Sequence, residues 1–269
     1  MEMRALGRMG PRTVSPELSA LVEAADHVAT RRPDCSFSVI VPTWNEERWL
    51  PTLLGKLERQ PSIAEVIIAD NSSSDDTVKI ALDANCRITS GGRPAAGRNA
   101  GAMAATEDIF LFIDADVAIS QDVLDSLNEQ FSRPGTELVY FRIVPDTDRL
   151  YVKAAYRAAD FYVLVGRLFG RPLGSAPLIC VSRMAFSKVG GFDEAMGAAE
   201  DVDFIRRVSR HVGGVRYVRS TPLHASARRF DLEGALGYSL KCVVWGLLRL
   251  VGLRVSLMSY KWERYPGNG

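Results

Sequence analysis

Short runs of apolar residues, each followed by a polar segment, dominate the first half of the chain. Three of these runs, Phe37–Pro42, Glu65–Asp70 and Asp108–Ile113, are rich in β-branched and aromatic side chains, which is typical of buried strands. After the first run, apolar residues recur at helical spacing and predict a helix through Leu50, Leu53, Leu54 and Leu57. This alternation of strand, loop and helix predicts an α/β fold with a mainly parallel central sheet.

Polar side chains follow all three predicted strands. Thr43, Asn45 and Glu46 come after the first strand, Asp70 ends the second, and Asp114 follows the third. In parallel α/β sheets ligands bind outside the carboxyl ends of the strands, so these side chains are expected to converge on one crevice. The alternative for Asp70 is that it only caps a turn and the helix that follows.

Two acidic clusters lie far apart in the sequence. In the first, Asp114 and Asp116 flank Ala115 at the end of a strand, and alternate residues of an extended segment point the same way. Such a pair suits Mg²⁺ or Mn²⁺, which prefer oxygen ligands and would bridge the diphosphate of a nucleotide donor. Acidic pairs also end strands in solvated loops, and that alternative stays open for the pair alone.

The second cluster consists of Glu200, Asp201 and Asp203, at the start of a helical pattern that continues to Val208. A carboxylate at a helix N-terminus is stabilised by the helix dipole and could act there as a general base. The alternative is an ordinary acidic cap of the helix.

A segment of small residues, Gly91–Ala105, precedes the first acidic cluster. Its glycines and alanines allow a helix to pack closely, and Arg93 and Arg98 could reach a phosphate. The segment matches neither the glycine pattern of dinucleotide-binding loops nor the lysine-bearing phosphate loop. A well-formed helix without a ligand is the alternative.

Together these segments resemble the family 2 glycosyltransferases. The resemblance rests on the order and spacing of the whole set and extends over about 36–230 of the chain. The segments that carry it are Ser38–Glu47, Ile68–Thr77, Gly97–Gly101, Phe112–Asp116, Gly190–Glu194 and Glu200–Phe204.

The resemblance implies a GT-A fold, a nucleotide-diphospho-sugar donor and inversion at the anomeric carbon. A UDP-sugar is the favoured donor, with a GDP-sugar as the second choice. Arg98 is implied to lie beside the donor, Asp114 to meet ribose and metal, and Asp116 to bind the metal. The residues implied to hold the nucleobase and ribose are Pro42, Thr43, Glu46 and Asp70.

The same resemblance assigns the catalytic base to the Glu-Asp cluster. Inverting transfer needs one carboxylate on the side of the sugar opposite the departing diphosphate, close enough to take a proton from the acceptor hydroxyl. Asp201 is expected to be this base, with Glu200 and Asp203 as alternatives.

Two late features extend the expected site. His224 follows a predicted strand at Val215–Val218, and some GT-A enzymes complete their metal site with a late histidine. His224 is therefore a candidate metal ligand, with a plain surface histidine as the alternative. Arg228 and Arg229 are expected to bind the donor diphosphate as a mobile flap closes over it.

Composition narrows the class of protein. The 269 residues, 47% of them hydrophobic, are enough for one enzyme domain with a substantial core. The balance of 33 basic and 32 acidic residues argues against nucleic acid as a partner. Four scattered cysteines without close pairing, and a start without the apolar core of a signal peptide, predict a reducing cytoplasm.

We expect three parts: an N-terminal extension with a short helix (1–33), a GT-A domain (34–231) and a C-terminal amphipathic helical segment (232–269). In the last part, Lys241, Trp245 and Arg249 lie opposite an apolar stripe. This mixture predicts peripheral contact with the inner face of the membrane and a lipid-linked or membrane-proximal acceptor. The alternative is a helix packed on the domain, with Trp245 covered by a second subunit in a homodimer.

Acceptor specificity is expected to come from residues Tyr140–Pro177, although the acceptor itself is not identified. The aromatic residues there either stack on a sugar ring or belong to the core: Tyr151, Tyr156, Phe161 and Tyr162. The predicted function is metal-dependent, inverting glycosyl transfer. The alternatives are a catalytically degenerate nucleotide-sugar-binding protein and a nucleotidyltransferase, which has no need of the late Glu-Asp pair.

Overall fold

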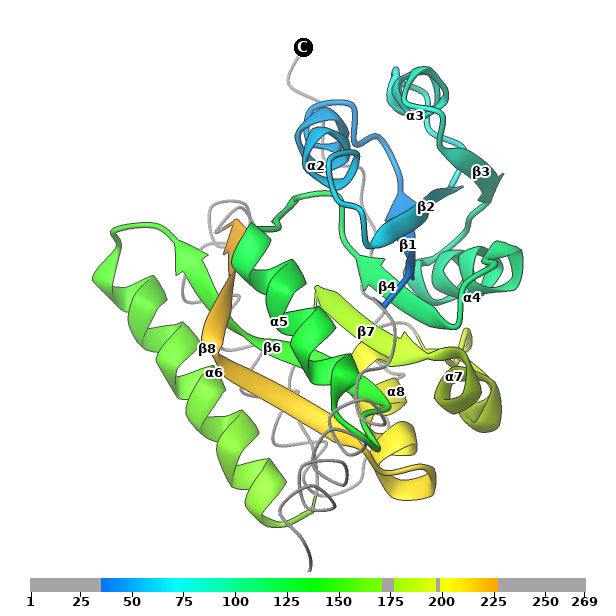
Figure 1. Ribbon diagram of the computed structural model, residues 1–269. Coiled ribbons are helices and arrows are strands. Elements are labelled where there is room, and N and C mark those ends of the chain that lie inside the picture. The colour runs from blue at the N-terminus through cyan, green and yellow to red at the C-terminus, as the bar shows by residue number, and fades with distance from the viewer. Residues whose placement is uncertain (1–34, 171–176, 197–198, 227–269) are drawn as a thin grey trace, which may run out of the picture. The chain divides into compact units, whose positions relative to one another are not determined.

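The computed structural model describes residues 35–170, 177–196 and 199–226 (Figure 1). Its strands form one sheet in the order β3-β2-β1-β4-β7-β6-β8-β5. Strands β5 and β7 run antiparallel to their neighbours, and the others share one direction. The predicted mainly parallel α/β sheet is therefore confirmed. The strands are β1 (Phe37–Thr43), β2 (Ile63–Asp70), β3 (Arg87–Ser90), β4 (Ile109–Ile113), β5 (Val117–Ala118), β6 (Leu138–Asp146), β7 (Leu178–Ser182) and β8 (Val215–Ser226).

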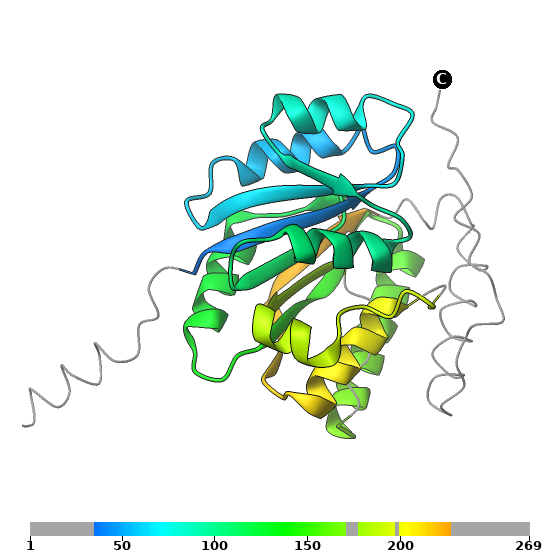
Figure 2. The ribbon, with the colours of Figure 1, turned by 90° about the vertical axis from the view of Figure 1, so that its right-hand side faces the viewer.

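Helices cover both faces of the sheet (Figure 2). The buried residues of one face come from the strands and from α2 (Leu50–Leu57), α3 (Thr77–Asp83) and α5 (Gln121–Ser132). Those of the other face come from the strands and from α4 (Pro94–Ala104), α6 (Leu150–Leu168), α7 (Arg183–Val189) and α8 (Glu200–His211). The protein is thus a three-layer structure, with both faces of the sheet buried as the apolar runs require.

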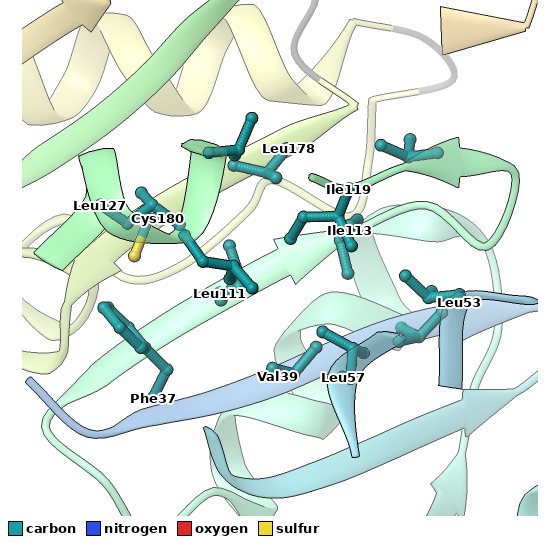
Figure 3. Packing of buried hydrophobic residues seen from close by; sticks show 14 of the residues in the cluster. Phe37, Val39, Leu53, Leu57, Leu111, Ile113, Ile119, Leu127, Leu178 and Cys180 are labelled. Atoms are coloured by element: carbon teal, nitrogen blue, oxygen red, sulfur yellow. The ribbon is translucent and has the colours of Figure 1, made fainter. Parts of the chain in front are cut away.

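The alternation of side chains along each strand builds both cores. In β1, Phe37 and Val39 face α2 and α5, whereas Ile40 faces the opposite layer. Figure 3 shows the first of these cores, where Leu53 and Leu57 of α2 pack against the strands. Burial of each such side chain stabilises the fold by about 1.5–3 kcal/mol.

Helix α4 packs unusually close to β1. A Cβ atom at Gly101 would overlap Cγ2 of Ile40, so only glycine permits this distance between helix and strand. At Gly97, a Cβ would lie 3.4 Å from the Cβ of Pro42, which turns toward the same helix. The small residues of 91–105 therefore bring α4 down onto the sheet over β1 and β2 (Figure 1).

Strand β8 is longer than the predicted strand at Val215–Val218 and continues to Ser226. Its parallel pairing with β6 is interrupted between Phe141 and Ile143, and Pro222 lies within the interrupted stretch. Proline has no backbone N–H for the ladder, which explains why a sequence-based prediction ends the strand earlier.

Several predictions fall on segments outside the described residues. These are the N-terminal extension (1–33), the C-terminal amphipathic segment (232–269) and the arginine pair Arg228–Arg229. Within the described part, Tyr151 and Phe161 of α6 are 52% and 68% exposed, so they do not belong to the core. No helix of the described residues is long and apolar enough to cross a membrane.

Candidate active site

The ends of β1 and β2 form one side of the site. Thr43 and Asp70 are paired residues in these two parallel strands, and Thr43 Oγ1 donates a hydrogen bond of 3.0 Å to Asp70 Oδ1. Asp70 also accepts from the Ser73 hydroxyl at 2.5 Å and the Ser73 backbone N–H at 2.9 Å. The predicted convergence of Thr43 and Asp70 is therefore present, and Asp70 also holds the turn that follows β2.

The loops after β1 and β2 are fastened to each other. The Asn45 N–H donates to Ser73 Oγ at 2.9 Å, and the Ser74 N–H donates back to Asn45 Oδ1 at 2.8 Å. Asn45 has a φ of 56°, a left-handed conformation that asparagine tolerates better than most residues. The Glu46 N–H donates to Thr77 Oγ1 at 2.8 Å, which fixes Glu46 beside the start of α3. These bonds give the loops one defined shape at the sheet edge.

Arg98 of α4 joins the two acidic clusters. Its Nη2 lies 2.9 Å from Asp114 Oδ1, and its Nη1 lies 2.7 Å from Glu200 Oε1. Only 7% of the Arg98 side chain is exposed, compared with 26% for Asp114 and 15% for Glu200. One guanidinium fork thus joins the two clusters, and Arg98 and Glu200 themselves stand 102 positions apart in the sequence.

The charge on Arg98 is secured by its surroundings. Burial alone would lower the pKa of the guanidinium, but Asp114, Glu200 and Asp201 together outweigh burial and raise that pKa. The Arg98 side chain also lies over the ring of Phe192, with 5.4 Å between Cζ and the ring centroid. Arg98 is therefore a fixed positive charge in the middle of the site.

The carboxylates at the start of α8 differ in their partners. Glu200 is bound to Arg98, and Asp203 forms an ion pair of 2.6 Å with Arg207 one turn along the helix. Asp201 is 7% exposed, and its Oδ1 lies 2.8 Å from the Val202 backbone nitrogen. The predicted base thus lies in the first helical turn, where the helix dipole stabilises its anion.

The candidate metal residues follow β4. Asp114 and Asp116 occupy the short link between β4 and β5, and both are partly exposed. Strand β5, which directly follows the link with Asp114 and Asp116, pairs with β8. In this pairing Ala118 stands opposite His224. In the part of the chain that the structure describes, no three acidic, histidine or cysteine side chains form a ready metal cluster. The ligand role of His224 stays a prediction.

Asn99 and Phe192 belong to this site, although the sequence analysis did not select them. Asn99 follows Arg98 on α4 and is hydrogen-bonded to the backbone of Phe192. Both lie inside segments that carry the family resemblance. Nothing local in the sequence signals their contact, because 93 positions separate them.

Comparison with known proteins places the chain in a family. The sequence model described as "Glycosyl transferase family 2" matches residues 38–187. The chain belongs to this family. The predicted family is therefore confirmed.

Two curated relatives illustrate the range of the family. The pre-mycofactocin glycosyltransferase of Mycobacterium tuberculosis is 33% identical over an alignment of 227 positions, which covers 76% of this chain and 46% of that protein. The 4,4'-diaponeurosporenoate glycosyltransferase of Staphylococcus haemolyticus is 32% identical over an alignment of 108 positions, which covers 36% of this chain and 29% of that protein. The chain spans about half the length of the first of these relatives.

Two solved structures share the GT-A fold of this chain. The glucosyl-3-phosphoglycerate synthase of M. tuberculosis, in complex with Mn²⁺, UDP-glucose and phosphoglyceric acid, has a TM-score of 0.59 at 18% identity. That match covers 91% of this chain and 86% of the synthase. TarS of Staphylococcus aureus in complex with UDP-GlcNAc has a TM-score of 0.58 at 19% identity, covering 79% of this chain and 66% of the TarS chain. The predicted GT-A fold is confirmed.

Proposed function

We propose that this protein transfers a sugar, with inversion, from a nucleotide-diphospho-sugar to an acceptor hydroxyl. The observation that carries the proposal is the double ion pair of Arg98, which brings the donor-side Asp114 and the base-side Glu200 into one site. A donor held at Asp114 would then have its anomeric carbon within reach of the start of α8. The meeting of the two acidic clusters supports a transferase, because a protein that only binds a nucleotide sugar has no use for the second cluster.

The nucleotide would lie along the ends of β1 and β2. Thr43, Asp70 and the fastened loops after these strands offer a preformed polar edge for ribose and base, with Pro42 and Glu46 beside them. Arg98 would balance the negative charge near the diphosphate. The UDP complexes of the structural neighbours support a UDP-sugar as the donor and leave a GDP-sugar as the second choice.

A divalent metal, Mg²⁺ or Mn²⁺, fits the residues present. Asp114 and Asp116 offer only oxygen donors, and such ions are commonly held by one or two carboxylates together with substrate phosphates. His224, on the strand that pairs with β5, is the proposed additional ligand. When bound, the metal would neutralise charge on the departing diphosphate.

We expect Asp116→Ala to lose metal-stimulated turnover almost completely. Full activity of this variant, or of the wild type in EDTA, would refute the metal assignment.

Asp201 is the proposed base. It stands next to Glu200, which is bound to Arg98, in the first turn of α8. Asp201 would take the proton of the acceptor hydroxyl as that oxygen attacks the anomeric carbon from the side opposite the diphosphate. Attack from that side gives inversion.

The proposed acceptor is lipid-linked or membrane-proximal, reached by a cytoplasmic enzyme at the inner face of the membrane. Support comes from α6, where Leu150 is 81%, Phe161 68% and Leu168 84% exposed. Asp160, the only acidic residue of α6, is buried, whereas Arg157 is exposed. An apolar and basic helix surface suits an anionic lipid layer. The C-terminal segment with Lys241, predicted to act in the same way, lies outside the described residues.

Co-sedimentation with anionic liposomes tests the membrane proposal. We expect the wild type to sediment at low salt, and two variants to sediment less: Phe161→Ser with Leu168→Ser, and Lys241→Glu with Arg249→Glu. Liposomes of zwitterionic lipid serve as the control for charge. Absence of wild-type sedimentation, combined with a dimer by light scattering, would favour the homodimer through the C-terminal segment instead.

The transfer reaction itself is tested with a panel of UDP-, GDP- and dTDP-sugars, with and without Mn²⁺. We expect slow hydrolysis of one donor, stimulated by Mn²⁺, with release of the nucleoside diphosphate. Tight binding of a donor without turnover would favour the degenerate binding protein. Release of pyrophosphate from a nucleoside triphosphate and a sugar phosphate would favour a nucleotidyltransferase.

A further inference from the structure

Both polar atoms of the Asn99 side-chain amide bind one loop, the segment between α7 and α8 that contains Phe192 and Glu194. Its Nδ2 donates to the Phe192 carbonyl at 2.9 Å and to Glu194 Oε1 at 2.8 Å. Its Oδ1 accepts from the Phe192 N–H at 2.9 Å. Because the contact needs two donors and an acceptor on a short side chain, asparagine suits it and aspartate does not.

The loop comes so close to Asn99 that one of its residues must be glycine. Gly191 has a φ of 70°, and a Cβ atom there would lie 2.7 Å from Asn99 Oδ1. Both the left-handed backbone and the short distance therefore exclude a side chain at this position. The glycine and the asparagine form one tightly fitted contact between α4 and the loop.

Phe192 carries this contact to the helix that bears the base. Its ring is 2% exposed and stacks on Phe204 of α8, with 4.2 Å between the ring centroids. It also contacts the ring of Phe112 in β4 edge to face, with 5.1 Å between the ring centroids. The loop is thus packed between the strand that leads to Asp114 and the helix that begins at Glu200.

We propose that Asn99 is a positioning residue for the transfer reaction. By holding the Phe192 backbone it fixes the Phe192 ring, the ring fixes α8 through Phe204, and α8 places Asp201 opposite the donor. Arg98 and Asn99, neighbours on α4, then set the donor side and the base side of the site from one helix. This inference rests on the proposed function, since it assigns Asp201 a catalytic task.

The test compares Asn99→Ala and Asn99→Asp with a matched amide deletion, Gln121→Ala. Gln121 makes a 2.8 Å hydrogen bond to Asp125, one turn along α5, and both residues are exposed. For both Asn99 variants we expect kcat for hydrolysis of the UDP-sugar identified by the panel to fall by about 10–100-fold. The dissociation constant of UDP, measured by calorimetry, should stay within about twofold. Gln121→Ala should match the wild type in both.

Amide hydrogen exchange gives a readout that needs no activity. In the Asn99 variants, exchange should accelerate at the Phe192 amide and at the Asp203 amide, which donates to the Ala199 carbonyl in the first turn of α8. Unchanged exchange at Asp203 would overturn the proposal, as would a wild-type kcat or a loss of activity that only follows weaker UDP binding. Asn99→Asp keeps the size of the side chain, so it covers the case in which Asn99→Ala does not fold. A wild type without hydrolysis would count against the proposed function, while the exchange data would still decide whether Asn99 positions α8.

Discussion

Arg98 is the residue on which the arrangement of the site depends most. Replacing it with methionine keeps a long, flexible side chain and removes the charge, so that Asp114 and Glu200 lose their shared partner. Removing one partner of a buried ion pair typically costs about 3–5 kcal/mol, and the partial exposure of Asp114 places Arg98→Met at the lower end. Urea unfolding of the variant should show this loss.

Arg98→Lys separates charge from geometry. A lysine keeps the positive charge but offers a single ammonium group, which cannot bind two carboxylates through a planar fork. We expect Arg98→Lys to recover part of the stability and little of the turnover. A methionine variant that unfolds at the same urea concentration as the wild type would show that the double ion pair does not hold the site together.

The contact between α4 and β1 can be tested with a pair of glycine substitutions. Alanine favours a helix over glycine by about 1 kcal/mol, so Gly55→Ala in α2, which has open space around it, should stabilise the protein. At Gly101 the added methyl group would overlap Ile40, and overpacking of this kind costs about 1–3 kcal/mol. The Tm should therefore rise for Gly55→Ala and fall for Gly101→Ala. A Gly101→Ala variant with a raised Tm would contradict the close packing.

Asp160 ties α6 to the sheet. It accepts hydrogen bonds from Tyr217 Oη at 2.6 Å and Arg219 Nη2 at 2.9 Å, and Arg142 Nε lies 3.4 Å away. Burial alone would raise the pKa of Asp160, but these partners outweigh burial and lower that pKa below its ordinary value of 3.8. The carboxylate therefore stabilises the fold above this ordinary value, and the stabilisation is lost as pH falls through the lower folded-state pKa.

Asp160→Asn should reveal this pH dependence. At neutral pH we expect the variant to be less stable by about 2 kcal/mol, because the charge-assisted hydrogen bond from Arg219 and the ion pair with Arg142 are lost. The difference in stability between the variant and the wild type should shrink at acid pH, where the wild-type carboxylate is protonated and carries no charge either. Urea midpoints compared at neutral and acid pH measure this, and a difference that stays constant with pH would rule out the ion pairs as its cause.

For the molecule as a whole, the sequence predicts those features of the fold that depend on residues close together in the chain. The strands that end at Thr43, Asp70 and Asp114 have continuous apolar runs, and their polar ends meet at one edge because parallel strands place them there. The pattern does not single out β7, Leu178–Ser182, whose antiparallel direction depends on pairing with β4 and β6. Local patterns carry no information about such distant partners.

The same limit applies to the site. The residue types were predictable, but the contacts of Arg98 with Glu200 and of Asn99 with Phe192 join segments about a hundred residues apart and appear only in the fold. Tyr151 and Phe161 show the same limit for burial: their helical spacing favours a place in the core, but both are exposed. Amphipathic patterns show that two faces of a helix differ, but not which neighbour covers them.

The central claim is that this site performs inverting sugar transfer with Asp201 as the base. Its most direct test is the turnover of Asp201→Asn, which keeps the shape of the side chain and removes its basicity, measured together with UDP binding. We predict that turnover of the UDP-sugar falls by about 10²–10⁴-fold while UDP affinity stays unchanged. Normal turnover of Asp201→Asn, with Glu200→Gln inactive, would contradict the assignment, and loss of UDP binding would make Asp201 a donor-site residue instead.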